Sequence, residues 1–204
     1  MATNTFVEIK LPEAAELADL TGILYDLASA RGMAQLLVKV LDDEKLRRDF
    51  VDPLSTAILV RYSRPFVTGV RKWLGEEALA VLDAQQRRKH ERLRAFRDKH
   101  IAHSVNAFEE NQPVARYWVE RVKDEGITSV ECNHSRIIGL SSADLEDVIE
   151  LSTAMLSYVE GRLRDEKAKV LEIVRQLPVE QILAQPQSGP ALPDLSKIDR
   201  SRKR

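Results

Sequence analysis

The composition of this chain favours helices over most of its length, and the clearest case is the segment at residues 141–177. Leu, Ala, Glu, Arg and Lys dominate, and glycine accounts for only 8 of the 204 residues. The five dominant residue types have high helix propensities, so the segment is predicted to form one long helix. Ser141 or Ser142 is expected to cap it, with acidic residues in the first turn. The sequence therefore predicts an all-α fold.

Helical spacing also extends through the first half of the chain. A first helix is expected to start near Pro12, which suits a first turn, and its apolar residues recur every three or four positions. Gly32 marks a point where this helix could break or kink. A second long helix is expected to be interrupted at Pro65, because proline removes a backbone donor. A third region, residues 75–110, is predicted to split near residues 84–86 into a short helix and a long one.

Residues 113–138 differ in composition from the helical regions and predict a β-hairpin. Strand-forming residues stand on either side of a glycine-containing loop at residues 123–126. They are Tyr117, Trp118, Val119, Ile127, Val130, Ile137 and Ile138. The domain prediction is thus one helical domain at residues 1–178, with the hairpin inserted before the last long helix. Residues 184–204 are rich in Pro, Ser and Gln and end in basic residues, which predicts a disordered tail.

The charge balance argues against broad electrostatic attraction to nucleic acid or to an acidic membrane. Lys and Arg number 31 against 32 Asp and Glu, so the net charge is −1, and any such contact must be local. Cys132 is the only cysteine and cannot form an internal disulfide, which suggests a reducing compartment. No apolar run approaches the ~18 residues that a membrane span requires. We therefore expect a soluble cytoplasmic protein with no membrane partner.

Residues 96–106, FRDKHIAHSVN, hold the densest group of candidate functional residues, including two of the four histidines. We expect residues 91–106 to form an α-helix, with a rotation of about 100° per residue. One face of this helix then holds Leu93, Phe96, Arg97, His100 and His103. Two interpretations of that face remain open: hydrogen-bonded core histidines beside an arginine paired with a carboxylate, or a reactive cluster. A metal site is not expected, because no carboxylate or cysteine pattern completes a ligand set.

Within this segment, RDKHIAH at residues 97–103 resembles the signature of the HEPN superfamily, in which an arginine and a polar residue precede a histidine by a few positions. Arg97, Asp98 and His103 occupy those three positions. The longer stretch LRAFRDKHIAHS is similar to the abortive-infection-type branch of that superfamily. The resemblance covers residues 10–175 and implies a HEPN-like helical bundle in which the hairpin is an elaboration.

The resemblance implies a metal-independent endoribonuclease that acts as a toxin or phage-defence effector and needs no cofactor. In such proteins the motif helices of two subunits meet, and one composite site forms in a homodimer. Attack of a ribose 2′-hydroxyl on the neighbouring phosphate needs a general acid and base, the role that falls to His103. The developing charge needs a fixed cation, the role that falls to Arg97. Asp98 is expected to orient one of these two, and His100 could assist or simply pack.

Two basic stretches supply candidate RNA-binding residues outside the motif. They are Arg87, Arg88 and Lys89, just before the motif, and Arg61 and Arg64 upstream. A solvated helix face is the simpler interpretation of both stretches. An antitoxin-like protein is a further possible partner. The alternative function is a non-catalytic HEPN-type module that binds a nucleotide, RNA or a protein.

Overall fold

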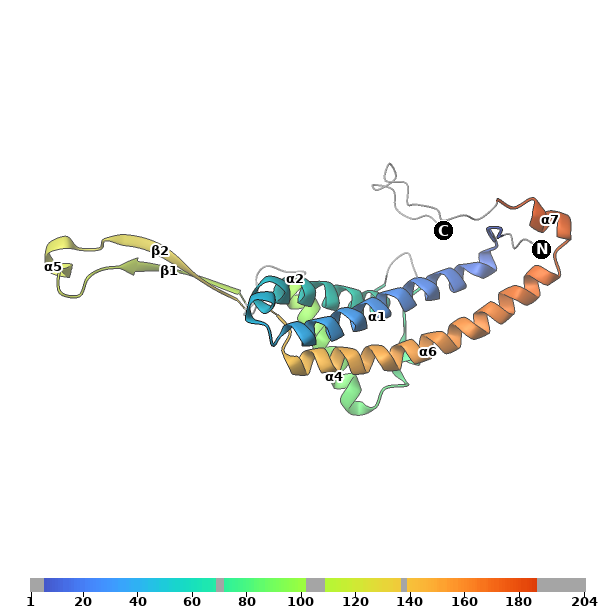
Figure 1. Cartoon of the computed structure of the whole chain (residues 1–204), viewed down its shortest axis with the longest axis horizontal. Coiled ribbons are helices and arrows are strands. Elements are labelled where there is room, and N and C mark those ends of the chain that lie inside the picture. The colour runs from blue at the N-terminus through green and yellow to red at the C-terminus, as the bar shows by residue number, and fades with distance from the viewer. Residues whose placement is uncertain (1–5, 69–71, 102–108, 137–138, 187–204) are drawn as a thin grey trace.

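The computed structural model describes residues 6–68, 72–101, 109–136 and 139–186. Most of the described chain is helical, and a two-stranded antiparallel sheet precedes the last long helix. Figure 1 shows a bundle of long helices with the hairpin extending from one end of it. The prediction of a helical fold with a hairpin before the last long helix is confirmed.

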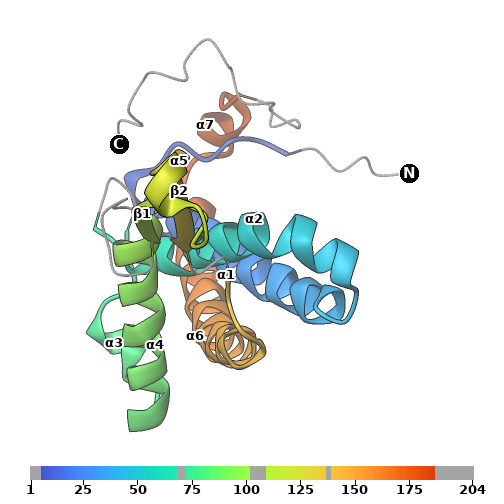
Figure 2. The ribbon, with the colours of Figure 1, turned by 90° about the vertical axis from the view of Figure 1, so that its left-hand side faces the viewer.

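Three long helices form the bundle: α1 (Ala15–Val40), α2 (Glu44–Ser63) and α6 (Ser142–Arg175). Helix α1 packs against both of the others, and Figure 2 shows the three side by side. Apolar side chains dominate the core between these helices and residues 84–96, and the largest with less than 2% exposure are Tyr62, Leu20, Ile23, Leu27, Leu37, Ile58, Leu59, Leu93, Leu145, Leu151, Met155 and Val148. Burial of these side chains is the main stabilising term of the fold.

The ends of the N-terminal helices follow local sequence signals. A short 3₁₀ turn, η1 (Pro12–Ala14), leads into α1, as the proline predicts. The expected break at Gly32 is wrong: α1 continues through it, because an exposed glycine costs a helix only about 1 kcal/mol. Helix α2 ends at Ser63, and Pro65 lies in the 3₁₀ turn η2 (Arg64–Phe66), so the predicted interruption is confirmed.

The region that was predicted to split does so at the expected place. A short helix, α3 (Glu76–Leu79), is followed by α4 (Ala84–Phe96). Asp83 starts α4 with a capping box, in which its carboxylate accepts hydrogen bonds from the backbone N–H of Gln85 and of Gln86. Helix α4 packs against α2 and α6.

The α-helix that was expected to continue to residue 106 ends earlier. From Arg97 to Ile101 the chain forms a π-helical turn, η3, which packs against α2. A π turn has i→i+5 hydrogen bonds in place of i→i+4. The rotation per residue that was assumed for the motif therefore does not hold beyond Phe96.

The predicted hairpin is present, but its first strand lies earlier than predicted, whereas the second contains the predicted Val130. Strand β1 (Glu109–Arg116) pairs with β2 (Ser129–Arg136), with Pro113 opposite Cys132. Between them lie the one-turn helix α5 (Val122–Glu125) and Gly126, whose φ of 65° is the left-handed conformation that favours glycine. The predicted strand residues Tyr117, Trp118, Val119 and Ile127 therefore lie at the tip, whereas Ile137 and Ile138 fall outside the described residues.

The last long helix begins as predicted. Ser141 is its N-cap and forms a capping box with Asp144. The predicted domain boundary at 178 precedes a short further helix, α7 (Val179–Leu183), which the sequence had not suggested. Residues 187–204, most of the predicted tail, lie outside the described residues. No helix in the described part of the chain combines the length and apolarity needed to cross a membrane.

The chain returns from the hairpin to the bundle through a close contact with α2. The N–H of Leu140 donates to Oγ of Ser55 over 2.9 Å, and both residues are buried. A Cβ at Gly139 would collide with the side chain of Val51 and lie 2.9 Å from Oγ of Ser55. Glycine is thus required at position 139, because a larger residue would push the chain off α2.

Replacing Gly139 with alanine is expected to lower the free energy of unfolding by about 1–3 kcal/mol, because the added methyl overpacks the contact with Val51. Urea denaturation followed by circular dichroism measures this change. Gly161→Ala is the matched control, because nothing lies within 4 Å of a Cβ there and the helix should gain slightly in stability. Equal stability of the two variants would contradict the close contact.

Candidate functional site

The π turn η3 carries the motif that the sequence singled out. The guanidinium of Arg97 lies 2.8 Å from a carboxylate oxygen of Asp98, and their side chains are 31% and 53% exposed. The expected contact between Asp98 and Arg97 is therefore present, although the α-helical projection had placed the two on different sides. Because the pair is accessible to solvent, it can meet a ligand.

The two motif histidines are less completely described. The backbone of His100 belongs to η3, and its side chain lies outside the described residues, as does the whole of His103. The expected row of Arg97, His100 and His103 on one helix face assumed α-helical spacing, which ends at Phe96. Leu93 and Phe96, which precede the row, do face the core as expected, since Leu93 is 1% exposed and Phe96 packs against the buried cluster.

Among the histidines whose side chains are described, His90 is buried, although the sequence assigned it no role. Nδ1 of His90 lies 2.8 Å from the hydroxyl oxygen of Tyr62, and the imidazole is 3% exposed. Phe66 packs edge-on against the imidazole, with ring centroids 4.5 Å apart. One interpretation of the motif histidines was that they are hydrogen-bonded core residues. That description fits His90, which lies on α4 before the motif turn. Helical spacing alone cannot separate the two cases, because His90 and Leu93 are neighbours on α4.

Burial sets the protonation of this pair. It lowers the pKa of His90 from 6.5 to about 4, and the positive charges of Arg94 and Arg87 act in the same direction. Burial also raises the pKa of the Tyr62 hydroxyl. Both side chains are therefore neutral at pH 7. Nε2 of His90 has no hydrogen-bond partner among the described residues.

The neutral His90 predicts a pH dependence of stability. The unfolded chain takes up a proton at this histidine near pH 6.5 and the folded chain only near pH 4, so stability is complete above pH 6.5 and falls as the pH drops toward 4. His90→Gln keeps a hydrogen-bonding group but removes the titration. It should flatten this decline, which is on the order of 1–3 kcal/mol. Urea unfolding at a series of pH values measures it, and His134→Gln on the exposed hairpin should retain the full decline.

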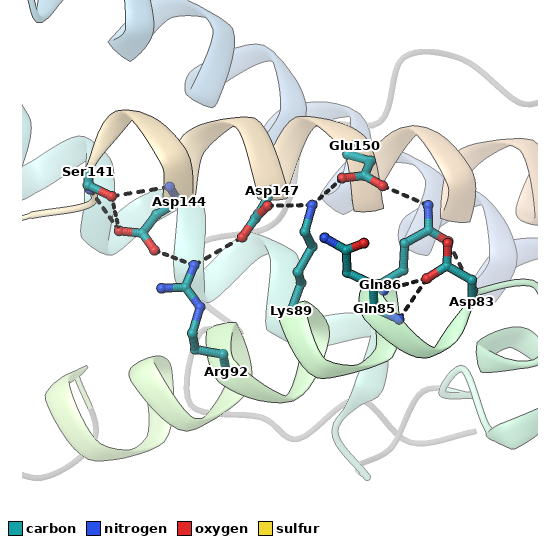
Figure 3. Close-up of polar contacts among 9 residues, drawn as sticks. All are labelled: Asp83, Gln85, Gln86, Lys89, Arg92, Ser141, Asp144, Asp147 and Glu150. Carbon is teal, nitrogen blue, oxygen red and sulfur yellow. Dashed lines mark hydrogen bonds and ion pairs between the residues drawn. The ribbon is translucent and has the colours of Figure 1, made fainter.

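A ladder of ion pairs holds α4, the helix that leads into the motif turn η3, to α6. Figure 3 shows its members, with Lys89 and Arg92 on α4 facing acidic side chains on α6. Nζ of Lys89 lies 2.8 Å from Asp147 and 2.6 Å from Glu150. Arg92 lies 2.5 Å from Asp144 and 3.0 Å from Asp147. We call these five side chains the α4–α6 ladder.

The ladder changes the titration of its members. Hydrogen bonds to Asp147 and Glu150 raise the pKa of Lys89, and hydrogen bonds from Lys89 and Gln86 lower the pKa of Glu150. Asp144 is also the N3 residue of the capping box of α6, and its other carboxylate oxygen accepts a hydrogen bond from Oγ of Ser141 over 2.6 Å. The carboxylate of Asp144 thus connects the start of α6 with Arg92 on α4.

Replacing Arg92 with alanine is expected to cost about 1–3 kcal/mol of unfolding free energy, because it leaves the mostly buried Asp144 without its ion pair. Thermal or urea denaturation measures the loss. Arg121→Ala removes the exposed ion pair between Arg121, just before α5, and Glu125, and should change stability by less than about 0.5 kcal/mol. A loss as small for Arg92→Ala would show that the ladder contributes little to stability.

The basic residues proposed for RNA binding are mostly paired with carboxylates. Arg61 and Arg64 both contact the buried carboxylate of Asp26, at 2.7 and 3.3 Å. Lys89 belongs to the α4–α6 ladder, and Arg87 lies 3.4 Å from Glu76 on the surface. Among the described residues, Arg88 alone of the five has no carboxylate partner.

The described residues give no metal site, and the hollow that they line on the bundle lies away from the motif. In the described ranges, no group of three or more His, Cys, Asp or Glu residues is arranged to hold a metal ion. A hollow of about 470 Å³ between α1 and α6 is lined by Leu24, Glu160, Leu163, Arg164 and Lys167. Helix α4, which leads into the motif turn, is bound near the N-terminal end of α6, so this hollow is separate from the motif.

Comparisons with known proteins find no relative: no family model matches the sequence, and no curated protein or solved structure is similar to it. The HEPN resemblance therefore remains a prediction from residues 97–103. The geometry around η3 and the chemistry of its side chains are what bear on the function of this chain.

Proposed function

We propose that this chain is a metal-independent endoribonuclease of the HEPN type, acting as a toxin or phage-defence effector. The observation that carries the proposal is the coincidence of the RDKHI segment with the π turn η3 at the end of α4. Single π turns inside helices are rare and occur frequently at functional sites. This one presents the paired side chains of Arg97 and Asp98 to solvent.

The proposed chemistry assigns one task to each motif residue. His103 removes the proton of the ribose 2′-hydroxyl, or donates one to the leaving 5′-oxygen, since an imidazole can do both near neutral pH. Arg97 offers a planar guanidinium that binds the charged phosphorane through two N–H groups. Asp98 restricts the orientation of Arg97 through the ion pair on η3. His100 is a secondary candidate on the same turn.

One copy supplies one His103 and one Arg97, whereas the reaction needs both an acid and a base. A homodimer that brings two motifs together would supply a pair of each. We therefore propose a composite site between two copies, with RNA as the substrate. An antitoxin-like protein would inhibit the enzyme by covering this site.

A binding module without catalysis is the second candidate, and the paired cations favour it. Four of the five basic residues proposed for RNA contact lie within 4 Å of a carboxylate, so they offer little free positive charge to a phosphate backbone. Such a module would bind a nucleotide, RNA or a protein at the motif without cleaving it.

The test compares the wild type with Arg97→Ala and His103→Ala on total RNA in the presence of a chelator. Cleavage should persist in chelator for the wild type and fall at least about 100-fold in each variant. Gel analysis of fragments with 2′,3′-cyclic phosphate ends measures the reaction.

Two matched controls separate a motif effect from a loss of charge or of histidine in general. Arg175→Ala, on the exposed last turn of α6, and His134→Ala, on the exposed hairpin, should cleave as the wild type does. If folded wild-type protein binds RNA but leaves it intact, the proposal of an endoribonuclease fails and the binding module is favoured.

A further inference from the structure

The hairpin has no support from the other described elements of its own chain. We call β1, α5 and β2 together, residues 109–136, the arm. Figure 1 shows the arm extending away from the bundle, with its two strands paired only to each other in the described structure. A two-stranded hairpin alone is marginally stable in water at best. The arm therefore needs a second surface to hold it.

The tip of the arm has the composition of a protein contact. Tyr117, Trp118 and Val119 are 50%, 59% and 74% exposed, and tryptophan and tyrosine are the residues most often found at the centre of protein interfaces. Two neighbouring arginines are already paired, Arg116 with Glu131 and Arg121 with Glu125. An apolar tip whose arginines are bound to carboxylates fits a protein surface better than a phosphate backbone.

One face of α1 is an apolar surface that no part of the described chain covers. Tyr25 and Leu36 are 69% and 51% exposed and lie on the same face of the helix as Ser29 and Gly32, which are also exposed. No carboxylate lies on this face, and Lys39 is at its C-terminal end. The arm, by contrast, has six acidic residues against four basic ones. The two surfaces are complementary both in apolar character and in charge.

The lengths of the two surfaces also match. An arm strand has 8 residues, which span about 26 Å at 3.3 Å per residue. Along α1, at 1.5 Å per residue, the same span covers about 17 residues back from Val40, which is close to Tyr25. Figure 1 shows that the C-terminal end of α1 and the base of the arm lie at the same end of the bundle. The arm, however, points away from its own α1 and cannot cover it.

We propose that the arm of one copy lies along the exposed face of α1 in a second copy, with Trp118 against Tyr25, and that the second copy returns the contact. A two-fold axis at the base of the arm, perpendicular to the long direction of the molecule, produces this arrangement. The same axis places the two η3 turns beside each other. The position of the axis rests on the proposed function, which requires two motifs to meet, whereas the contact between arm and α1 does not require cleavage of RNA.

The dimer dissociation constant, measured by analytical ultracentrifugation over a range of concentrations, tests the proposal. A dimer of either variant, Trp118→Ser or Tyr25→Ser, carries the substitution in both of its arm contacts. Each substitution should raise the dimer dissociation constant at least about 10-fold for every contact. Trp73→Ser is the matched control, because this tryptophan is also about half exposed, at 46%, but lies on the bundle outside α1. All three positions are exposed, so circular dichroism should show an unchanged helix content.

Mixing the two variants gives the sharper result. A mixed dimer has one intact contact, between the unaltered arm of one variant and the unaltered α1 of the other, and one contact that is impaired on both sides. It should therefore form at least about 10-fold more tightly than either variant alone. A wild type that remains monomeric, variants that dimerise as the wild type does, or a mixture without recovery would each overturn the proposal. These measurements use no RNA, so a failure of the arm contact is distinguishable from a failure of the endoribonuclease.

Discussion

The α4–α6 ladder determines where the rest of the candidate site can lie. Only His90 and Leu93 of α4 are buried, so this helix has little apolar surface with which to hold its position. Lys89 and Arg92 supply the missing attachment through carboxylates of α6 that are largely shielded from solvent. Networks of this kind stabilise more than isolated surface ion pairs do. The direction of η3, one turn further along, depends on them.

Ion pairs inside the bundle also engage most of the cations that the sequence suggested for nucleic acid. Lys89, Arg61 and Arg64 look like nucleic-acid ligands in sequence, but each is bound to a carboxylate from a distant part of the chain. These cations allow Asp26 and the α6 carboxylates to lie at helix contacts without a large desolvation penalty. Arg97 differs from them because its ion pair with Asp98 lies on η3 and is accessible to solvent.

Features set by neighbouring residues could be predicted from sequence, and features set by distant contacts could not. The cap at Ser141, the interruption at Pro65 and the helix start at Ala84 follow from local hydrogen bonding and from proline geometry. The π turn at Arg97 could not be predicted, because an extra residue in one turn leaves no mark in an apolar pattern. The role of His90 depends on Tyr62, which is 28 residues away. The hairpin itself was predictable, but its aromatic residues, which favour strands, lie at the tip.

The attachment of the arm at both ends has a consequence for how its length can vary. The chain is fixed before the arm by Arg92 on Asp144, and after it by Leu140 on Ser55. Between these points the arm is a loop whose ends are held by η3 and Leu140 on α2, and its described strands pair only with each other. Closing a longer loop costs little entropy, about 0.6 kcal/mol for each doubling of its length. Insertions and deletions in the arm should thus be tolerated by the bundle, so the arm can change its reach while η3 stays in place.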